Sequence, residues 1–178
     1  MKIIKRILIV LAGIVALLLI VALFIKKEYG VEKEIVINKP KQQVFDYVKL
    51  LKNQDNYSFW AMQDPAMKKS YNGTDGTVGF VSSWESEKMG TGEQEIKKIA
   101  EGERLDFELR FLKPFQATDY AYMTTEPVSD NQTKVKWGFN GKMPYPMNLM
   151  LPIMNMEKML GDQLQTGLDN LKSNLEKQ

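Results

Sequence analysis

The middle of this sequence contains side chains of the types that transfer protons. Carboxylates, a guanidinium and phenols occur within one stretch, at Glu93, Glu95, Arg110, Asp119, Tyr120 and Tyr122. A hydroxyl or carboxylate that faced a dry cavity would have a shifted pKa and could act as a general acid or base. The same residues are typical of the solvated face of a strand, which accounts for nearly all of them. We therefore predict no catalytic residue, and the sequence leaves an enzymatic role open.

Two residue types are missing from the chain, which has 178 residues and contains neither Cys nor His. Without Cys there is no disulfide, thiolate nucleophile or Cys-ligated metal, and without His the commonest general base and zinc ligand are lacking. Ser-His-Asp and Cys-His catalysis are excluded. We expect no metal and no cofactor.

Methionines crowd the region that precedes and begins the last predicted helix, at Met143, Met147, Met150, Met154, Met156 and Met159. Their side chains are flexible and polarizable, so a Met-rich wall can adapt to varied apolar ligands. Two other interpretations are core packing beneath a sheet and a helix N-terminus that lies against a bilayer.

Large aromatic side chains offer further apolar surface, either as core or as cavity lining. Trp60 lies outside the predicted strands near a predicted cavity mouth, so we expect it to gate or line the entrance. The ligand-binding set that we predict is apolar throughout: Trp60, Phe80, Trp84, Phe107, Leu109, Phe111, Trp137, Phe139, Met150, Met154 and Leu164.

Hydrophobic periodicity predicts the elements that position these residues. Alternation predicts a half-buried strand at residues 31–37, and helical spacing predicts a helix at 41–51. The middle of the chain alternates apolar and charged residues between turn signals, which predicts about six antiparallel strands with one dry face. Around Tyr120 the inward side is ambiguous. Residues 147–175 predict a long amphipathic helix that Pro152 should break or kink.

This order of elements predicts an α+β fold. A curved antiparallel sheet of about seven strands would wrap around the long C-terminal helix and enclose a space lined by both. One N-terminal transmembrane helix would precede this domain.

The transmembrane helix is predicted from residues 7–25, an uncharged run of 19 between Arg6 and Lys26. At about 1.5 Å per residue the run spans roughly 28 Å, close to the hydrocarbon thickness of a bilayer. A cleaved signal peptide would have a shorter apolar region and a small-x-small site, whereas this run ends in Leu23-Phe24-Ile25. We therefore expect residues 1–29 to be a retained single-pass anchor and residues 30–178 to be the ligand-binding domain.

Charge separates the two parts further. The domain carries 19 basic and 21 acidic residues, a net charge of −2, so the basic character of the chain lies beside the membrane segment. A slightly acidic domain argues against nucleic acid as a partner. A short positive tail before a first apolar segment usually stays in the cytoplasm, so we expect a periplasmic or extracellular domain. Basic residues also follow the segment, so a cytoplasmic domain is the alternative.

Short stretches along the domain also form a pattern by their order and spacing: Ser58-Phe59-Trp60, Asp64-Pro65, Met67-Lys68, Gly73 to Gly79, Trp84, Gly90-Thr91-Gly92-Glu93, Leu112-Lys113-Pro114-Phe115, Glu126-Pro127, Thr133-Lys134-Val135-Lys136-Trp137 and Gly167-Leu168-Asp169-Asn170-Leu171-Lys172. Over about residues 30–176 this pattern resembles the SRPBCC superfamily of START-like, polyketide cyclase and lipid transport proteins, and in particular a membrane-anchored bacterial subgroup. The resemblance implies a helix-grip fold whose cavity holds an apolar or amphipathic small molecule. It supplies no catalytic residues, because the superfamily shares a shape rather than one chemistry.

The function that we predict is membrane-anchored binding of a lipid-like or polyketide-like molecule. One alternative is a polyketide cyclase-like enzyme, which needs at least two titratable groups within hydrogen-bond reach of one point in the cavity. Another is a protein-interaction module at the membrane, which would have a filled core and an exposed apolar patch.

Overall fold

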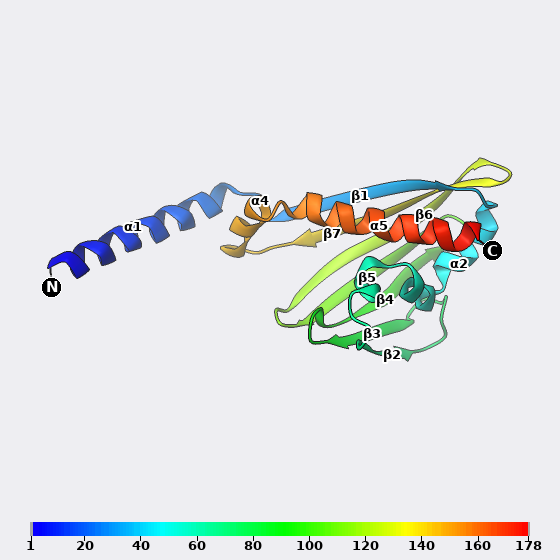
Figure 1. Ribbon diagram of the computed structural model, residues 1–178, viewed down its shortest axis with the longest axis horizontal. Helices are drawn as coiled ribbons and strands as arrows, with labels where there is room; N and C mark the ends of the chain where they lie inside the picture. Colours follow the sequence, from blue (N-terminus) through cyan, green and yellow to red (C-terminus); the bar gives the residue numbers. More distant parts are fainter. Residues whose placement is uncertain (1, 178) are drawn as a thin grey trace.

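The computed structural model describes residues 2–177 and contains one long N-terminal helix followed by a domain of helices and a β-sheet (Figure 1). The helices are α1 (Lys2–Phe24), α2 (Lys41–Lys49), α3 (Phe59–Met62), α4 (Met150–Ile153) and α5 (Met156–Glu176), with 3₁₀ turns η1 (Leu51–Asn56) and η2 (Met147–Leu149). The strands are β1 (Glu28–Ile37), β2 (Lys68–Asn72), β3 (Val81–Ser86), β4 (Gly90–Ala100), β5 (Arg104–Lys113), β6 (Ala117–Ser129) and β7 (Gln132–Lys142).

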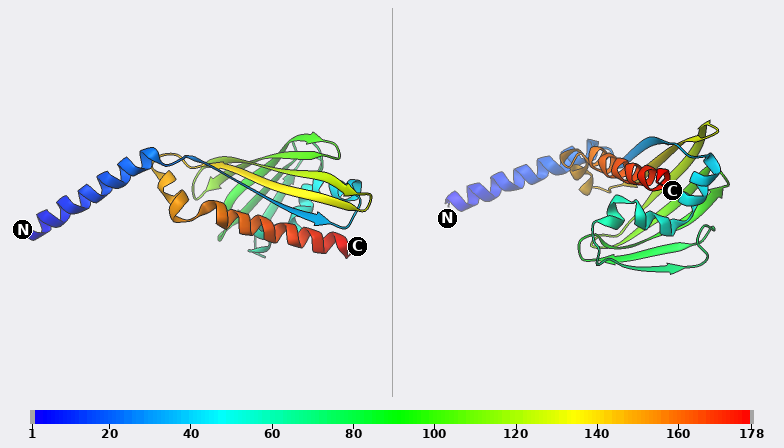
Figure 2. Two further views of the ribbon diagram at one scale, coloured as in Figure 1. Left: turned by 90° about the horizontal axis from the view of Figure 1, so that it is seen from above. Right: turned by 45° about the vertical axis from the view of Figure 1, so that its right-hand side comes forward.

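The seven strands form one antiparallel sheet in the order β1-β7-β6-β5-β4-β3-β2. The first and last strands of the chain pair over their full length, from Glu28 opposite Lys142 to Ile37 opposite Thr133. Figures 1 and 2 show the sheet curving around α5, which crosses its concave face. The predicted α+β helix-grip fold is confirmed.

Side-chain alternation in β6 settles the ambiguity around Tyr120. Asp119, Ala121 and Met123 are buried on the concave face, whereas Tyr120 and Tyr122 point to the outer face. Ala121 and Met123 therefore face the interior of the domain, and the phenols of Tyr120 and Tyr122 lie among the charged residues of the outer face.

The continuous C-terminal helix, α5, is shorter than the predicted segment 147–175. That segment is interrupted as Pro152 predicts, but the break lies after that residue: α4 ends at Ile153, Asn155 adopts a left-handed conformation with φ of 45°, and α5 begins at Met156. Pro152 itself is tolerated in the first turn of α4, where backbone N–H groups lack intrahelical partners in any case.

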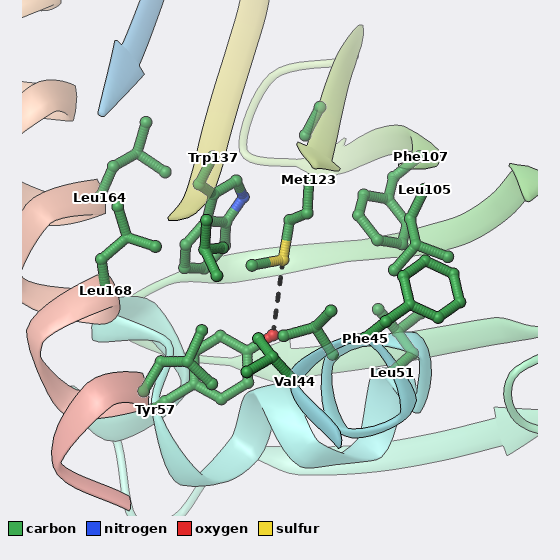
Figure 3. Close-up of a cluster of buried hydrophobic side chains, with 14 of the residues drawn as sticks. Val44, Phe45, Leu51, Tyr57, Leu105, Phe107, Met123, Trp137, Leu164 and Leu168 are labelled. Atoms are coloured by element: carbon green, nitrogen blue, oxygen red, sulfur yellow. Dashed lines mark hydrogen bonds between the residues drawn. The ribbon is translucent and has the colours of Figure 1, made fainter. Parts of the chain in front are cut away.

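The hydrophobic core lies between α5, α2 and the concave face of the sheet (Figure 3). The buried stripe of α5 consists of Leu160, Leu164, Leu168, Leu171 and Leu175. At Gly167 the helix approaches the sheet closely, because a Cβ there would lie 2.8 Å from the Trp137 ring. Beside Trp137, Tyr57 is fully buried and its hydroxyl lies 3.7 Å from the Met123 sulfur.

Helix α1 projects away from the domain (Figure 1) and most of its side chains are exposed. Its 23 residues make it long and apolar enough to cross a membrane.

Candidate ligand cavity

A cavity of about 400 Å³ lies between the concave face of the sheet, the η1–α3 segment and the N-terminal half of α5. This volume is within the range of natural small-molecule sites. Its walls are mainly aromatic and aliphatic, and polar or charged side chains, among them Asp55, Lys69 and Asp119, make up the rest. Such walls favour an apolar or amphipathic molecule over a highly charged one.

Six of the eleven predicted ligand-binding residues line this cavity: Trp60, Trp84, Leu109, Phe111, Trp137 and Phe139. The three tryptophans are all those in the chain. Trp60 of α3 meets Trp137 of β7 edge to face, with ring centroids 6.1 Å apart, and its indole N–H donates to Gln163 Oε1 at 3.1 Å. Trp60 thus links α3 to both the sheet and α5.

The opposite wall depends on a glycine. Trp84 of β3 packs edge to face on Phe111 of β5, with centroids 5.9 Å apart. A Cβ at Gly92 would lie 2.5 Å from the Trp84 ring, so only glycine at this place in β4 allows the indole its position. The absence of a side chain at Gly92 therefore determines where Trp84 lies in this wall.

The other five predicted residues lie elsewhere. Phe80, Phe107 and Leu164 are at most 1 % exposed in the packed core. Figure 3 shows Phe107 beside Leu105 and Phe45, where α2 fills the space that the cavity occupies further along β5. Met150 and Met154 precede the break at Asn155, so they are not on the face that α5 turns to the sheet.

The methionine cluster is divided by that same break. Met156 and Met159, on the first turn of α5, line the cavity, whereas Met147 and Met154 are exposed. Two methionines from outside the cluster, Met67 and Met89, complete the thioether surface. Their flexibility suits a wall that adapts to its occupant.

Tyr29 is a lining residue that the sequence analysis missed. The predicted strand began at residue 31, but β1 begins at Glu28, and extending the alternation back by one step from Val31 would have placed Tyr29 on the inner face. Its ring occupies the space beside Gly141, where a Cβ would lie 2.3 Å from the phenol carbon.

Asp119 is the one member of the proton-transfer set that lines the cavity. It is 5 % exposed, accepts a hydrogen bond from the Lys142 N–H at 3.2 Å, and lies beside the Tyr29 hydroxyl. Burial raises the pKa of the Asp119 carboxyl above its usual range, although both neighbours act in the opposite direction. Burial, followed by the adjacent carboxylate, also raises the pKa of Tyr29.

A pH-dependent stability follows from this raised pKa. Folded Asp119 holds its proton to a higher pH than the unfolded residue, so stability should fall as the pH rises from about 4, the ordinary value for Asp, through the folded pKa. Asp119→Asn should stabilise the fold at pH 7. In urea unfolding curves measured over a series of pH values, it should remove the part of the pH dependence that Asp119 causes. Asp130→Asn, in the exposed β6–β7 turn, is the control and should keep the wild-type profile. If Asp119→Asn left the dependence of stability on pH unchanged, the buried carboxylate would not be its source.

The remaining members of the set lie on the outer face of the sheet. Arg110 is bonded to Glu93 at 2.6 Å, to Glu95 at 2.7 Å and also to Glu108. Tyr122 donates to Glu32 at 2.5 Å, and Tyr120 is 54 % exposed. These residues lie away from the cavity lining. Across residues 2–177, acidic side chains do not gather into a group of three that could hold a metal ion.

The sequence of the domain matches a known protein family. Residues 29–176 match the family described as polyketide cyclase / dehydrase and lipid transport. The chain belongs to this family. The matched region begins at the second residue of β1 and ends at the last residue of α5, so it comprises all but one residue of the sheet and the helix that the sheet encloses. Among curated proteins, none matches the sequence significantly.

Solved structures show how widely this family fold is shared. A protein from Mesorhizobium loti has 13 % identity and a TM-score of 0.62, covering 84 % of this chain and 98 % of that one. Ara h 8.0201 has 14 % identity and a TM-score of 0.57, covering 85 % and 99 %. DynU16, a protein of the dynemicin biosynthetic locus, has 14 % identity and a TM-score of 0.57, covering 83 % of this chain and 47 % of that one. All three have the START/Bet v1-like fold of the polyketide cyclase and lipid transport family.

Proposed function

We propose that α1 anchors the chain in a membrane and that the cavity binds one apolar or amphipathic molecule, lipid-like or polyketide-like. The observation that carries this proposal is the cavity itself, about 400 Å³ in volume and walled by all three tryptophans. The family's description includes lipid transport and polyketide cyclisation, which supports a ligand of this class. In this proposal residues 1–29 are the anchor, residues 30–178 are the binding domain, and Trp60, Trp84, Leu109, Phe111, Trp137 and Phe139 contact the ligand.

The composition of the cavity sets the character of the ligand. Its apolar wall matches a hydrocarbon or fused-ring body, which gains roughly 25 cal/mol for each Å² of apolar surface removed from water. Asp119 and Tyr29 form one polar place in that wall, and the ion pair of Lys69 with Asp55, at 2.5 Å, forms another. A ligand hydroxyl or amine could donate to the Asp119 carboxylate. An amphiphile with one polar end fits both features.

Saturable binding of a fatty acid probe tests the proposal. The full chain in lipid nanodiscs would be titrated with 9,10-dibromostearate, whose bromines quench tryptophan on contact. Because α1 contains no tryptophan and all three indoles line the cavity, quenching reports cavity occupancy. We expect quenching that saturates at one probe per chain.

The anchor has its own test. We expect the full chain to remain in the membrane pellet after a carbonate wash, with the domain on the periplasmic or extracellular side. The variant with Leu11→Asp and Leu18→Asp should be released, because each carboxylate near the helix centre costs about 2.5–3.5 kcal/mol. A wild-type soluble form that begins near residue 26 would contradict the anchor.

An enzyme is the second candidate, and one observation favours it. Asp119 and Tyr29 bring two titratable groups together in the cavity, which is the minimum that acid–base catalysis needs. Asp119→Asn and Tyr29→Phe separate the two functions. The carboxylate of dibromostearate has no hydrogen-bond donor to offer Asp119. Both variants should therefore keep binding of this probe within about threefold, below the tenfold that 1.4 kcal/mol represents. A loss of turnover on the order of 100-fold, with stability retained, would support the enzyme.

A further inference from the structure

A second cavity, of about 330 Å³, lies at the junction between α1 and the domain. Its walls come from the chain just after α1, from α4 and from the first turn of α5, and include Ile25, Leu151 and Glu157. Tyr29 and Met156 line both this junction cavity and the ligand cavity. The two cavities are therefore neighbours, and these two side chains form their boundary.

The junction has a fixed geometry. The side-chain N–H₂ of the fully buried Asn148 donates to the Ala22 carbonyl at 2.7 Å and to the Ile25 carbonyl at 2.9 Å. The last carbonyls of a helix lack intrahelical donors, so Asn148 satisfies the end of α1 from outside. A further hydrogen bond runs from the Met143 N–H to the Lys27 carbonyl at 2.8 Å. The end of α1 is thus held beside α4 and the start of α5 (Figure 2). The junction cavity is lined by residues of these segments.

Exposed apolar side chains surround this place. Ile153 is 71 % exposed, Met147 50 % and Met154 44 %, all of them in the segment that Asn148 fixes to α1. If α1 spans a bilayer, its last turn and Lys26 lie at the level of the headgroups. The exposed side chains then lie at that level too, which gives their apolar surface a lipid partner.

We propose that the junction cavity is the portal through which an amphiphile passes between the bilayer and the ligand cavity, with Tyr29 and Met156 as its gate. The inference rests on the proposed binding function and adds the route. Met156 suits a gate because its unbranched thioether can change rotamer without backbone movement. A portal at the membrane surface keeps the apolar part of the ligand out of water throughout its transfer.

The absence of Cys from the chain allows a single-site test. Glu157→Cys, exposed and in the wall of the junction cavity, would be labelled with a bulky maleimide in the full-length protein. Lys158→Cys with the same label is the matched control, since Lys158 is exposed on the same turn but lines neither cavity. Stopped-flow tryptophan quenching would then follow dibromostearate delivered from dioleoylphosphatidylcholine vesicles to each protein in nanodiscs.

We expect the label at position 157 to slow quenching at least about tenfold, with an unchanged final amplitude, and the label at position 158 to leave the rate unchanged. Met156→Ala, which removes half of the gate, should speed quenching in the unlabelled chain. Equal rates for the two labelled proteins with Met156→Ala at the parent rate would overturn the portal and leave binding intact. Absent quenching in the unlabelled parent would overturn the binding function and the portal with it.

Discussion

Phe107→Ala should lower the free energy of unfolding by about 3–5 kcal/mol, the cost of truncating an aromatic ring in a packed core. Phe107 is 1 % exposed and lies among Leu105, Phe45 and the other core side chains, so its removal leaves a new void. Phe111 lies four residues further along β5, on the same face, but it lines the existing cavity.

Phe111→Ala is the matched comparison. It should cost about 1–2 kcal/mol, because the ring loses burial without leaving an additional void in close-packed surroundings. Urea unfolding of both variants in nanodiscs, followed by tryptophan emission, measures the difference. Equal losses for Phe107→Ala and Phe111→Ala would show that the two environments are packed alike and would contradict the cavity.

Ala121→Phe should weaken dibromostearate binding at least about tenfold, the equivalent of 1.4 kcal/mol. Ala121 lies on the cavity side of β6, directly between Phe107 of β5 and Phe139 of β7. A phenyl ring there would project into the space that the ligand needs. Because that space is empty of protein atoms, stability should change by less than about 1 kcal/mol.

The control for this variant places the same ring in the packed core. Val135→Phe lies on β7 at a fully buried position and should destabilise the fold by about 1–3 kcal/mol through overpacking. The folded variant should bind the probe with an affinity within about threefold of the parent protein. This change is well under the tenfold that corresponds to 1.4 kcal/mol. Strong destabilisation by Ala121→Phe with unchanged binding would mean that position 121 lies in packed core and not beside the ligand.

Periodicity predicted which way side chains face, and for that reason it recovered the fold and the aromatic walls of the cavity. Alternation along β5 places Phe107, Leu109 and Phe111 on one face, as the structure shows. It could not predict where along this face the core ends and the cavity begins. That boundary depends on α2 and η1, whose side chains fill the space over Phe107 but not over Leu109.

The misplaced methionines have a different cause. Helical spacing carried the predicted apolar face back through Met154 and Met150, but the left-handed Asn155 turns the chain before α5 begins. A change of Met154 therefore does not probe the ligand cavity. Asp119 was weighed with five similar side chains, and sequence alone could not distinguish it, because β6 alternates phenols with small residues and its inward side depends on the register with β7.

Tryptophan quenching by 9,10-dibromostearate in the full-length, nanodisc-embedded protein measures whether the cavity takes up a ligand. We expect saturation at one probe per chain, lost in Ala121→Phe and retained in Val135→Phe. Quenching that rises linearly with probe and is the same in Ala121→Phe would mean that the cavity takes no ligand, and it would contradict the binding function.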